Sequence, residues 1–411
     1  MSFYLSHDLF PAATPRDWGL IGGLNFSIAL LVAPLATLLA RLVGFRRVMM
    51  LGLILLPAGL LAASFATSTW HLYLSQGACV GAGVGFLYMP AMPIVSQWFD
   101  KKRSLANGIC AAGSGIAGLI MCFVTQAMLD RIGLAWALRV TAIIAFTMNA
   151  VSTALMRSRN KDINPTQRMF DYRLLRRYEV ILVLAWSFVM MFGYITLMFS
   201  LSDYTRAIGR SASDAATVVA LLNLGAALIR PLIGVAADRY GRINIACILT
   251  VSCGILCFVL WLPTKSFAAL IVFSILGGGI LGVFWSVCAR TALVMILEFL
   301  RVVQSETDSN SQLIGPISAD IVDLNELPSM LSLVWLSIVL PSTCKNHVLV
   351  LLHVDLRMLI RIVAEVIALA LRREQAKFPY LYTQIFGGFS YLISSLFLFE
   401  LLRVRRMKAA I

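Results

Sequence analysis

Charged residues are scarce in this sequence of 411 residues. Asp, Glu, Lys and Arg together make up 13% of the chain, about half the share that a soluble domain carries. Apolar residues make up 60%, and the mean hydropathy is +0.86. A water-soluble fold cannot bury so much apolar surface without leaving large exposed patches. The composition therefore excludes a soluble enzyme or nucleic-acid binder and indicates a protein that lies in a lipid bilayer.

Metal-binding and catalytic groupings are lacking as well. The four histidines are scattered between positions 7 and 353, and at least seven of the eight cysteines lie inside apolar runs, where cysteine behaves as a small hydrophobic residue. Cys253 and Cys257 stand one helical turn apart, without a histidine or carboxylate beside them. The sequence offers no nucleophile–base pair. We therefore expect neither an enzyme nor a protein that holds a cofactor or a metal.

Long apolar runs are abundant. An α-helix rises 1.5 Å per residue, so about 20 apolar residues cross a hydrocarbon core of roughly 30 Å. Eleven runs reach or approach that length: 18–40, 48–67, 72–97, 104–128, 137–156, 180–200, 214–236, 243–262, 267–289, 329–343 and 380–402. The polar stretch 157–179 predicts a cytoplasmic linker between an N-terminal helical half, 1–156, and a C-terminal half, 180–402, which a basic cytoplasmic tail, 403–411, follows. The sequence thus predicts an all-α membrane protein.

The net charge of +14 is explained by the loops. In membrane proteins Lys and Arg gather in cytoplasmic loops. When the tail 403–411 is placed in the cytoplasm, the segments on that side hold 21 basic residues, and the outer segments up to residue 266 hold five. The segment 344–379 breaks the pattern, with six basic residues on the nominal outside. The positive charge therefore indicates orientation in the membrane rather than a nucleic-acid partner.

An internal repeat relates the two halves. Pro34 precedes Gly44 by ten residues, and Pro231 precedes Gly241 by the same distance, at an offset of 197 residues. Each stretch ends an apolar run, turns at glycine and opens a basic loop. Two repeated helical halves joined by a central linker are the architecture of many secondary transporters.

The loop of the second copy carries a sharper motif, GVAADRYGR. Gly241 permits a tight turn, Arg239 and Arg242 hold the loop at the cytoplasmic face, and Asp238 is suited to accept hydrogen bonds from a neighbouring helix N-terminus. A solvated basic loop without a further role is the alternative interpretation. The motif resembles the loop signature of the major facilitator superfamily. The first copy, 37–46, lacks the corresponding first Gly and the Asp.

A longer motif follows the glycine-rich span 76–90. The sequence WFDKKRSLANGICAAGSGIAG at 98–118 resembles the junction of the fourth and fifth helices in the monocarboxylate porter family, most closely its fungal branch. The resemblance implies the major facilitator fold, with about eleven of its transmembrane helices present. It also implies alternating access and a role in gating or topology for the basic residues Lys101, Lys102 and Arg103.

Arg230 is the one clear charge that we identify within a predicted span, eight residues before Asp238 and about 12 Å from the cytoplasmic end. An arginine in lipid is costly unless it faces a cavity or a partner. Two interpretations stay open: an arginine that reaches toward the loop, and a guanidinium that binds an anionic substrate through its planar donors. The porter family carries Arg-Pro at this point, so the resemblance favours substrate binding.

Two neighbours of Arg230 qualify this hypothesis. Asn223 lies two turns earlier on nearly the same face, where it extends a polar lining or forms an interhelical hydrogen bond. The porters carry an Asp one turn before the Arg, as part of a proton-coupling pair, and this chain has Ala226 there. The resemblance therefore leaves proton coupling open.

Glycines at helical spacing predict close contacts between helices, because a helix without Cβ atoms on one face lets another backbone approach. A moving helix interface would use the same residues, so the pattern does not separate packing from gating. The glycines are Gly77, Gly81 and Gly85 in one span, and Gly113 and Gly118 in the next.

Three places depart from the twelve-helix pattern of the family. The first helix has no counterpart, and the stretches 293–312 and 345–364 interrupt the resemblance. We hypothesise a gene model with a late start codon and retained introns. A genuine variant with an extra amphipathic helix around 348–371 is the alternative.

Three functions remain in competition. The first is movement of a small organic anion, monocarboxylate-like, with or without protons as a second partner. The second is export of a larger organic metabolite or drug. The third is a truncated or receptor-like family member that transports nothing. For each of them we expect an integral protein of the plasma membrane rather than of the vacuole, with no nucleic-acid partner.

Overall fold

The computed structural model describes residues 10, 15–99, 103–163, 171–264, 266–281, 314–323, 325–339 and 380–409. Every regular element within these ranges is helical, which confirms the predicted all-α fold. The unusual stretches 293–312 and 345–364 and most of the basic segment 344–379 lie outside the described residues. The first elements are α2 (Pro15–Val43), α3 (Phe45–Ala63), α4 (Thr69–Leu72), the π-helix η1 (Tyr73–Cys79), α5 (Val80–Trp98), α6 (Arg103–Leu155) and α7 (Asn160–Ile163). The later ones are the 3-10 helix η2 (Leu174–Arg176), α8 (Tyr178–Ala207), α9 (Ala212–Tyr240), α10 (Arg242–Leu256), the π-helix η3 (Cys257–Trp261), α11 (Phe267–Leu281), α13 (Ile314–Ile321), α14 (Leu327–Ser337) and α18 (Leu381–Ala409).

Nine helices within the described ranges are long and apolar enough to cross a membrane, and α11 and α14 are shorter apolar helices. Together they coincide with the eleven predicted runs, with shifted ends. The clearest difference lies in α6, which contains two of those runs. The sequence predicts a loop over 129–136, whereas the structure turns at Gly133 (φ 74°). One glycine suffices for the turn because it tolerates a positive φ.

The sequence repeat reappears in the helix bounds. Helices α2 and α9 begin and end 197 residues apart, and α3 and α10 begin with the same offset. Each pair turns at one glycine with positive φ, Gly44 (φ 90°) in the first and Gly241 (φ 92°) in the second. A side chain would be strained in this region of φ, so glycine gives both pairs the same tight turn.

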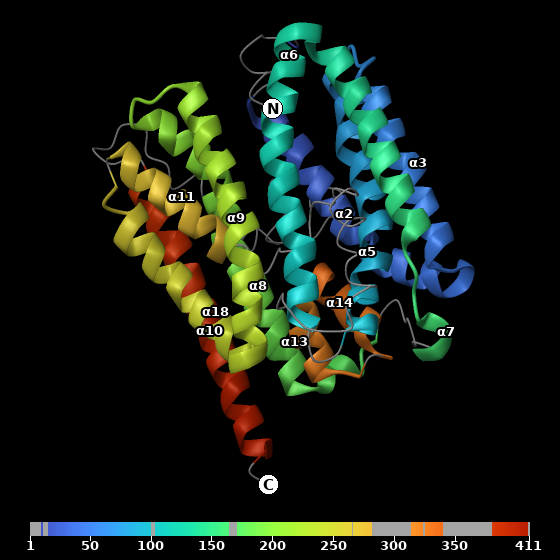
Figure 1. Ribbon diagram of the computed structural model, residues 1–411, viewed down its shortest axis with the longest axis vertical. Coiled ribbons are helices and arrows are strands. Elements are labelled where there is room, and N and C mark those ends of the chain that lie inside the picture. The colour runs from blue at the N-terminus through green and yellow to red at the C-terminus, as the bar shows by residue number, and fades with distance from the viewer. Residues whose placement is uncertain are drawn as a thin grey trace, which may run out of the picture.

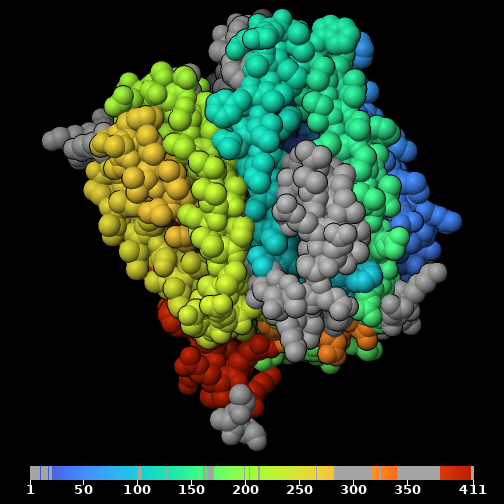
Figure 2. Space-filling view, in the orientation of Figure 1, coloured from blue at the N-terminus to red at the C-terminus, as the bar shows by residue number. Residues whose placement is uncertain are grey.

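The helices form two groups that meet along two contacts. We call α2 to α6 the N-terminal bundle and the helices from α8 to α18 the C-terminal bundle. Figure 1 shows α6 and α9 side by side between the groups, and in Figure 2 their outer surfaces adjoin. The second contact is made by α14, which packs against α2 and α5 of the N-terminal bundle as well as against α8.

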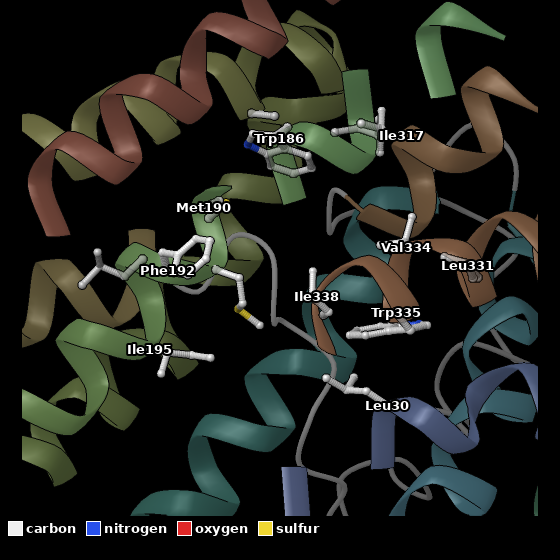
Figure 3. Close-up of a cluster of buried hydrophobic side chains, with 14 of the residues drawn as sticks. Leu30, Trp186, Met190, Phe192, Ile195, Ile317, Leu331, Val334, Trp335 and Ile338 are labelled. Carbon is white, nitrogen blue, oxygen red and sulfur yellow. The ribbon is translucent and has the colours of Figure 1, made fainter. Parts of the chain in front are cut away.

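A large apolar cluster fills the region where α2, α8 and α14 meet. Figure 3 shows Trp186 and Met190 of α8 and Trp335 of α14, and all three side chains are fully buried. Leu30 of α2 belongs to the same cluster, so the cluster joins the two bundles. Because lipid tails are as apolar as these side chains, close packing rather than escape from solvent stabilises the contact.

Candidate functional site

Arg230 lies at the α6–α9 contact, between the two bundles. Its side chain is 7% exposed, and its Nη1 donates a long hydrogen bond of 3.4 Å to the Ser114 hydroxyl of α6. The Ser114 hydroxyl in turn donates to the carbonyl of Ala111 at 2.7 Å, which fixes its orientation. The guanidinium is therefore a buried positive charge held by a neutral hydroxyl from the opposite bundle. Such a charge is suited to bind an anion.

Asn223 lies two turns earlier at the same contact. Its Nδ2 donates to the carbonyl of Val219 in its own helix at 3.1 Å. Its Oδ1 lies only 2.7 Å from the place that a Cβ on Gly118 of α6 would take. Gly115 approaches the backbone of α9 in the same way, 2.6 Å from the Asn223 carbonyl oxygen. The structure thus brings Asn223 and Arg230 to one interface, with Asn223 packed against glycine.

The second-copy loop forms a network around Arg242. Its Nε lies 3.0 Å from Oδ1 of Asp238 and donates to the Ser104 hydroxyl of α6 at 2.9 Å, and its Nη1 pairs with Asp320 of α13. Asp238 is 7% and Arg242 14% exposed at the side chain, so the pair is largely buried. The network joins the C-terminal bundle to α6 of the N-terminal bundle. The carboxylate of Asp238 is bound by Arg242, not by the helix N-terminus that the sequence suggests nor by Arg230.

The remaining loop residues have simpler surroundings. Gly241 turns the chain between α9 and α10, and the Arg239 side chain is exposed. Lys101 and Lys102 lie outside the described residues, and of Arg103 only the backbone, at the start of α6, is described. The predicted roles of this basic triplet therefore stay predictions.

The glycines of the third span lie against α2. A Cβ on Gly77 would meet the Leu24 side chain at 2.9 Å, and Cβ atoms on Gly81 and Gly85 would meet backbone carbonyl oxygens of α2. This face packs within the N-terminal bundle. Gly118 instead faces α9, and Gly113 is buried in α6.

Sequence reasoning misses the polar partners of this region. Ser104 and Ser114 stand inside the motif at 98–118, but hydroxyls among small residues carry no distinctive signal. A further pair, Thr37 of α2 and Ser332 of α14, is hydrogen bonded at 2.6 Å between the bundles. The two positions are 295 residues apart, so no local pattern connects them.

The statement that Arg230 is the one clear charge within a span is wrong. Arg139 lies inside the predicted run 137–156 as well. Its guanidinium stacks on Phe65 at 4.5 Å and on Trp136 at 5.0 Å, and its Nε donates to Ser64 at 3.1 Å. Aromatic faces and a hydroxyl thus accommodate this charge near a helix end.

The fold and the site define a multi-pass helical membrane protein of two repeated bundles, with a buried cation where they meet. The family model of the Major Facilitator Superfamily matches residues 4–300. The chain belongs to this family, whose members are transporters and not enzymes.

Three relatives illustrate the similarity. "Probable transporter MCH2" of Saccharomyces cerevisiae is 33% identical over 294 residues, which are 70% of this chain and 62% of the relative. "Uncharacterized transporter ESBP6" of the same organism is 35% identical over 295 residues, 69% of this chain and 44% of the relative. "Agnestins efflux protein AgnL12" of Paecilomyces divaricatus is 26% identical over 235 residues, 57% of this chain and 54% of the relative. The chain thus spans less than two thirds of the length of each of them.

Proposed function

We propose that this protein is a secondary active transporter that moves a small organic anion, monocarboxylate-like, by alternating access. The observation that carries the proposal is the buried guanidinium of Arg230 at the contact between the bundles. Membership of the Major Facilitator Superfamily and similarity to a probable transporter support it. Planar donors match the geometry of a carboxylate, and the burial of Arg230 strengthens its attraction to an anion.

Alternating access requires that contacts between the bundles break at one end while others form. Arg242 to Ser104 and Thr37 to Ser332 are such contacts, and both pairs lie near the predicted cytoplasmic end. In this proposal they close the pathway on that side and separate when the substrate site opens to the cytoplasm. Asp238, Arg239, Gly241 and Arg242, with the triplet Lys101 to Arg103, serve as gating and topology elements.

Proton coupling is a separate part of the proposal. The position one turn before Arg230 holds Ala226, which is 2% exposed, so a carboxylate at this position does not carry the proton. Anion uptake by the full chain in lipid vesicles, with and without an imposed pH gradient, tests coupling directly. Uptake that rises with external acid supports a proton partner, and uptake that ignores the gradient excludes one.

Substitution of Arg230 tests the substrate site. Arg230→Gln removes the charge, and we expect labelled-monocarboxylate uptake to fall on the order of 10- to 100-fold, because hydrogen bonds to charged groups contribute about 1.5–3 kcal/mol. Arg230→Lys keeps the charge without the planar donors and should retain part of the activity. Arg239→Gln removes an exposed arginine from the same helix and serves as the matched control. Equal uptake by Arg230→Gln and the parent protein contradicts the assignment of Arg230.

A second candidate function is export of a larger organic metabolite. It is favoured by the similarity to a relative named as an efflux protein. Vesicles preloaded with labelled metabolites, followed for release, separate export from uptake. If neither direction of movement is found for any anion, the third hypothesis remains, a family member that does not transport. The location in the plasma membrane stays a proposal, which a tagged full chain in cells tests.

A further inference from the structure

Helix α18 is longer than a membrane requires. Its 29 residues, Leu381–Ala409, span about 43 Å at 1.5 Å per residue, whereas the hydrocarbon core measures roughly 30 Å. The excess of about two turns carries Arg403, Arg405, Arg406 and Lys408. Figure 1 shows this end of α18 extending beyond the other helices, and Figure 2 shows its surface there. These residues therefore lie at the level of the lipid headgroups on the predicted cytoplasmic side.

The segment 172–178, which enters α8, is fixed against the protein from one side. Leu174 is 1% exposed, and Nη1 of Arg177 pairs with Oε2 of Glu326 at 2.8 Å. The backbone N–H of Arg173 donates to the Asp171 carboxylate at 3.2 Å. These contacts hold the segment so that its other side chains point outward. The exposed side chains are Tyr172, Arg173, Leu175, Arg176 and Tyr178.

An ion pair brings this segment next to the end of α18. Nζ of Lys408 lies 3.2 Å from Oε1 of Glu179, which is three residues after Arg176. We call the exposed cations of the two elements the α8–α18 basic surface. They are Arg173, Arg176, Arg403, Arg406 and Lys408.

The nearby carboxylates do not neutralise this surface. Glu179 pairs with Lys408, Glu326 with Arg177, and Glu400 with Arg403 at 3.4 Å. Within the described part of the chain, the side chains of Arg173, Arg176 and Arg406 make no hydrogen bond or ion pair. Three exposed guanidinium groups thus remain for an external anion.

We infer that the α8–α18 basic surface binds the headgroups of anionic phospholipids in the cytoplasmic leaflet. Guanidinium groups bind phosphate through paired hydrogen bonds, and tyrosine and leucine side chains favour the zone between headgroups and acyl chains. Exposed arginines interleaved with exposed Tyr172, Leu175 and Tyr178 combine both properties in one segment. A loop that only sets orientation needs the charges, but it needs neither the apolar side chains nor the gathering of two elements. The site is distinct from Arg230 and does not depend on transport.

The test uses the full chain in a neutral detergent, with short-chain phosphatidylserine added and short-chain phosphatidylcholine as the uncharged counterpart. We expect phosphatidylserine to raise the thermal unfolding midpoint at concentrations at least about tenfold below those of phosphatidylcholine, since each basic residue near an anionic surface changes binding about fivefold. The double variant Arg176→Gln/Arg406→Gln should need on the order of 20-fold more phosphatidylserine. Its midpoint without lipid should equal that of the parent, because neither side chain has a partner within the described residues.

The matched control is Arg41→Gln/Arg47→Gln, which removes two exposed arginines from the N-terminal bundle on the same predicted side. It should leave the phosphatidylserine response within about twofold of the parent, because each lost contact is worth about fivefold. An equal loss in both double variants means that only overall charge is sensed, and it overturns the inference. Glycerophosphoserine and inorganic phosphate identify the source of the anion. If either acts at the concentration of phosphatidylserine, the surface binds soluble phosphate and the lipid assignment is wrong.

Discussion

The helix pairs α2–α3 and α9–α10 turn at Gly44 and Gly241, whose φ angles of 90° and 92° are nearly equal. Their helices share an offset of 197 residues in the sequence. The chemistry placed on this common backbone differs at three repeat positions. Arg230, Asp238 and Arg242 of the second pair stand where the first pair has Ala33, Arg41 and Phe45.

The difference assigns separate roles to the two copies. Ala33 is fully buried and Phe45 packs beside an apolar cluster of α3 and α5, so the first copy serves mainly to build the N-terminal bundle. The second copy places Arg230 and Arg242 on hydroxyls of α6. Glycine fixes the turn, whereas the side chains around it decide whether the turn reaches the opposite bundle. A duplicated backbone therefore does not imply duplicated function.

The largest expected effect comes from Arg242→Ala. It leaves the largely buried carboxylate of Asp238 without its cation, and loss of one partner of a buried pair costs about 3 kcal/mol of stability. Phe45→Ala, at the equivalent position, removes only partly buried apolar contacts and should cost about 1 kcal/mol. Unfolding of both purified variants in the same detergent, followed by tryptophan fluorescence, measures the two costs.

A second-site variant sharpens this prediction. Asp238→Asn removes the charge that Arg242→Ala leaves unpaired, so the double variant should recover part of the loss. If Arg242→Ala and Phe45→Ala destabilise equally and Asp238→Asn restores nothing, the two loops do not differ in the way that the network implies.

The next effect concerns the two glycines. Gly44→Ala and Gly241→Ala each force a side chain into a sparsely populated region of φ, which costs about 1–3 kcal/mol. A Cβ at Gly44 meets open space, whereas at Gly241 it lies 3.0 Å from Nδ2 of Asn244. Gly241→Ala should therefore lower the thermal midpoint at least as much as Gly44→Ala. A neutral alanine at either position would show that this turn does not need its positive φ.

The glycines also mark what the sequence can predict. Apolar run length predicts the helices, because a bilayer demands about 20 apolar residues, and the Pro-to-Gly spacing predicts both turns. The site is harder, because its partners are remote in the chain. Arg242 meets Asp320 and Ser104, which are 78 and 138 residues away, and no periodic pattern encodes such contacts. The turn within α6 fails for a local reason, since Gly133 alone replaces an expected loop.

The smallest expected effect lies in the first copy, which reaches the opposite bundle through Thr37. Its hydroxyl and that of Ser332 are 2.6 Å apart, and each also bonds to a carbonyl of its own helix. A double-mutant cycle of Thr37→Val and Ser332→Ala should give a coupling energy of about 0.6 kcal/mol, because hydrogen bonds between membrane helices average about that value. Each hydroxyl lost from its own helix is removed from the coupling by the cycle. A coupling energy as large as the cost of Arg242→Ala would mean that the first copy holds the bundles together as firmly as the second, against the division of roles inferred from the two turns.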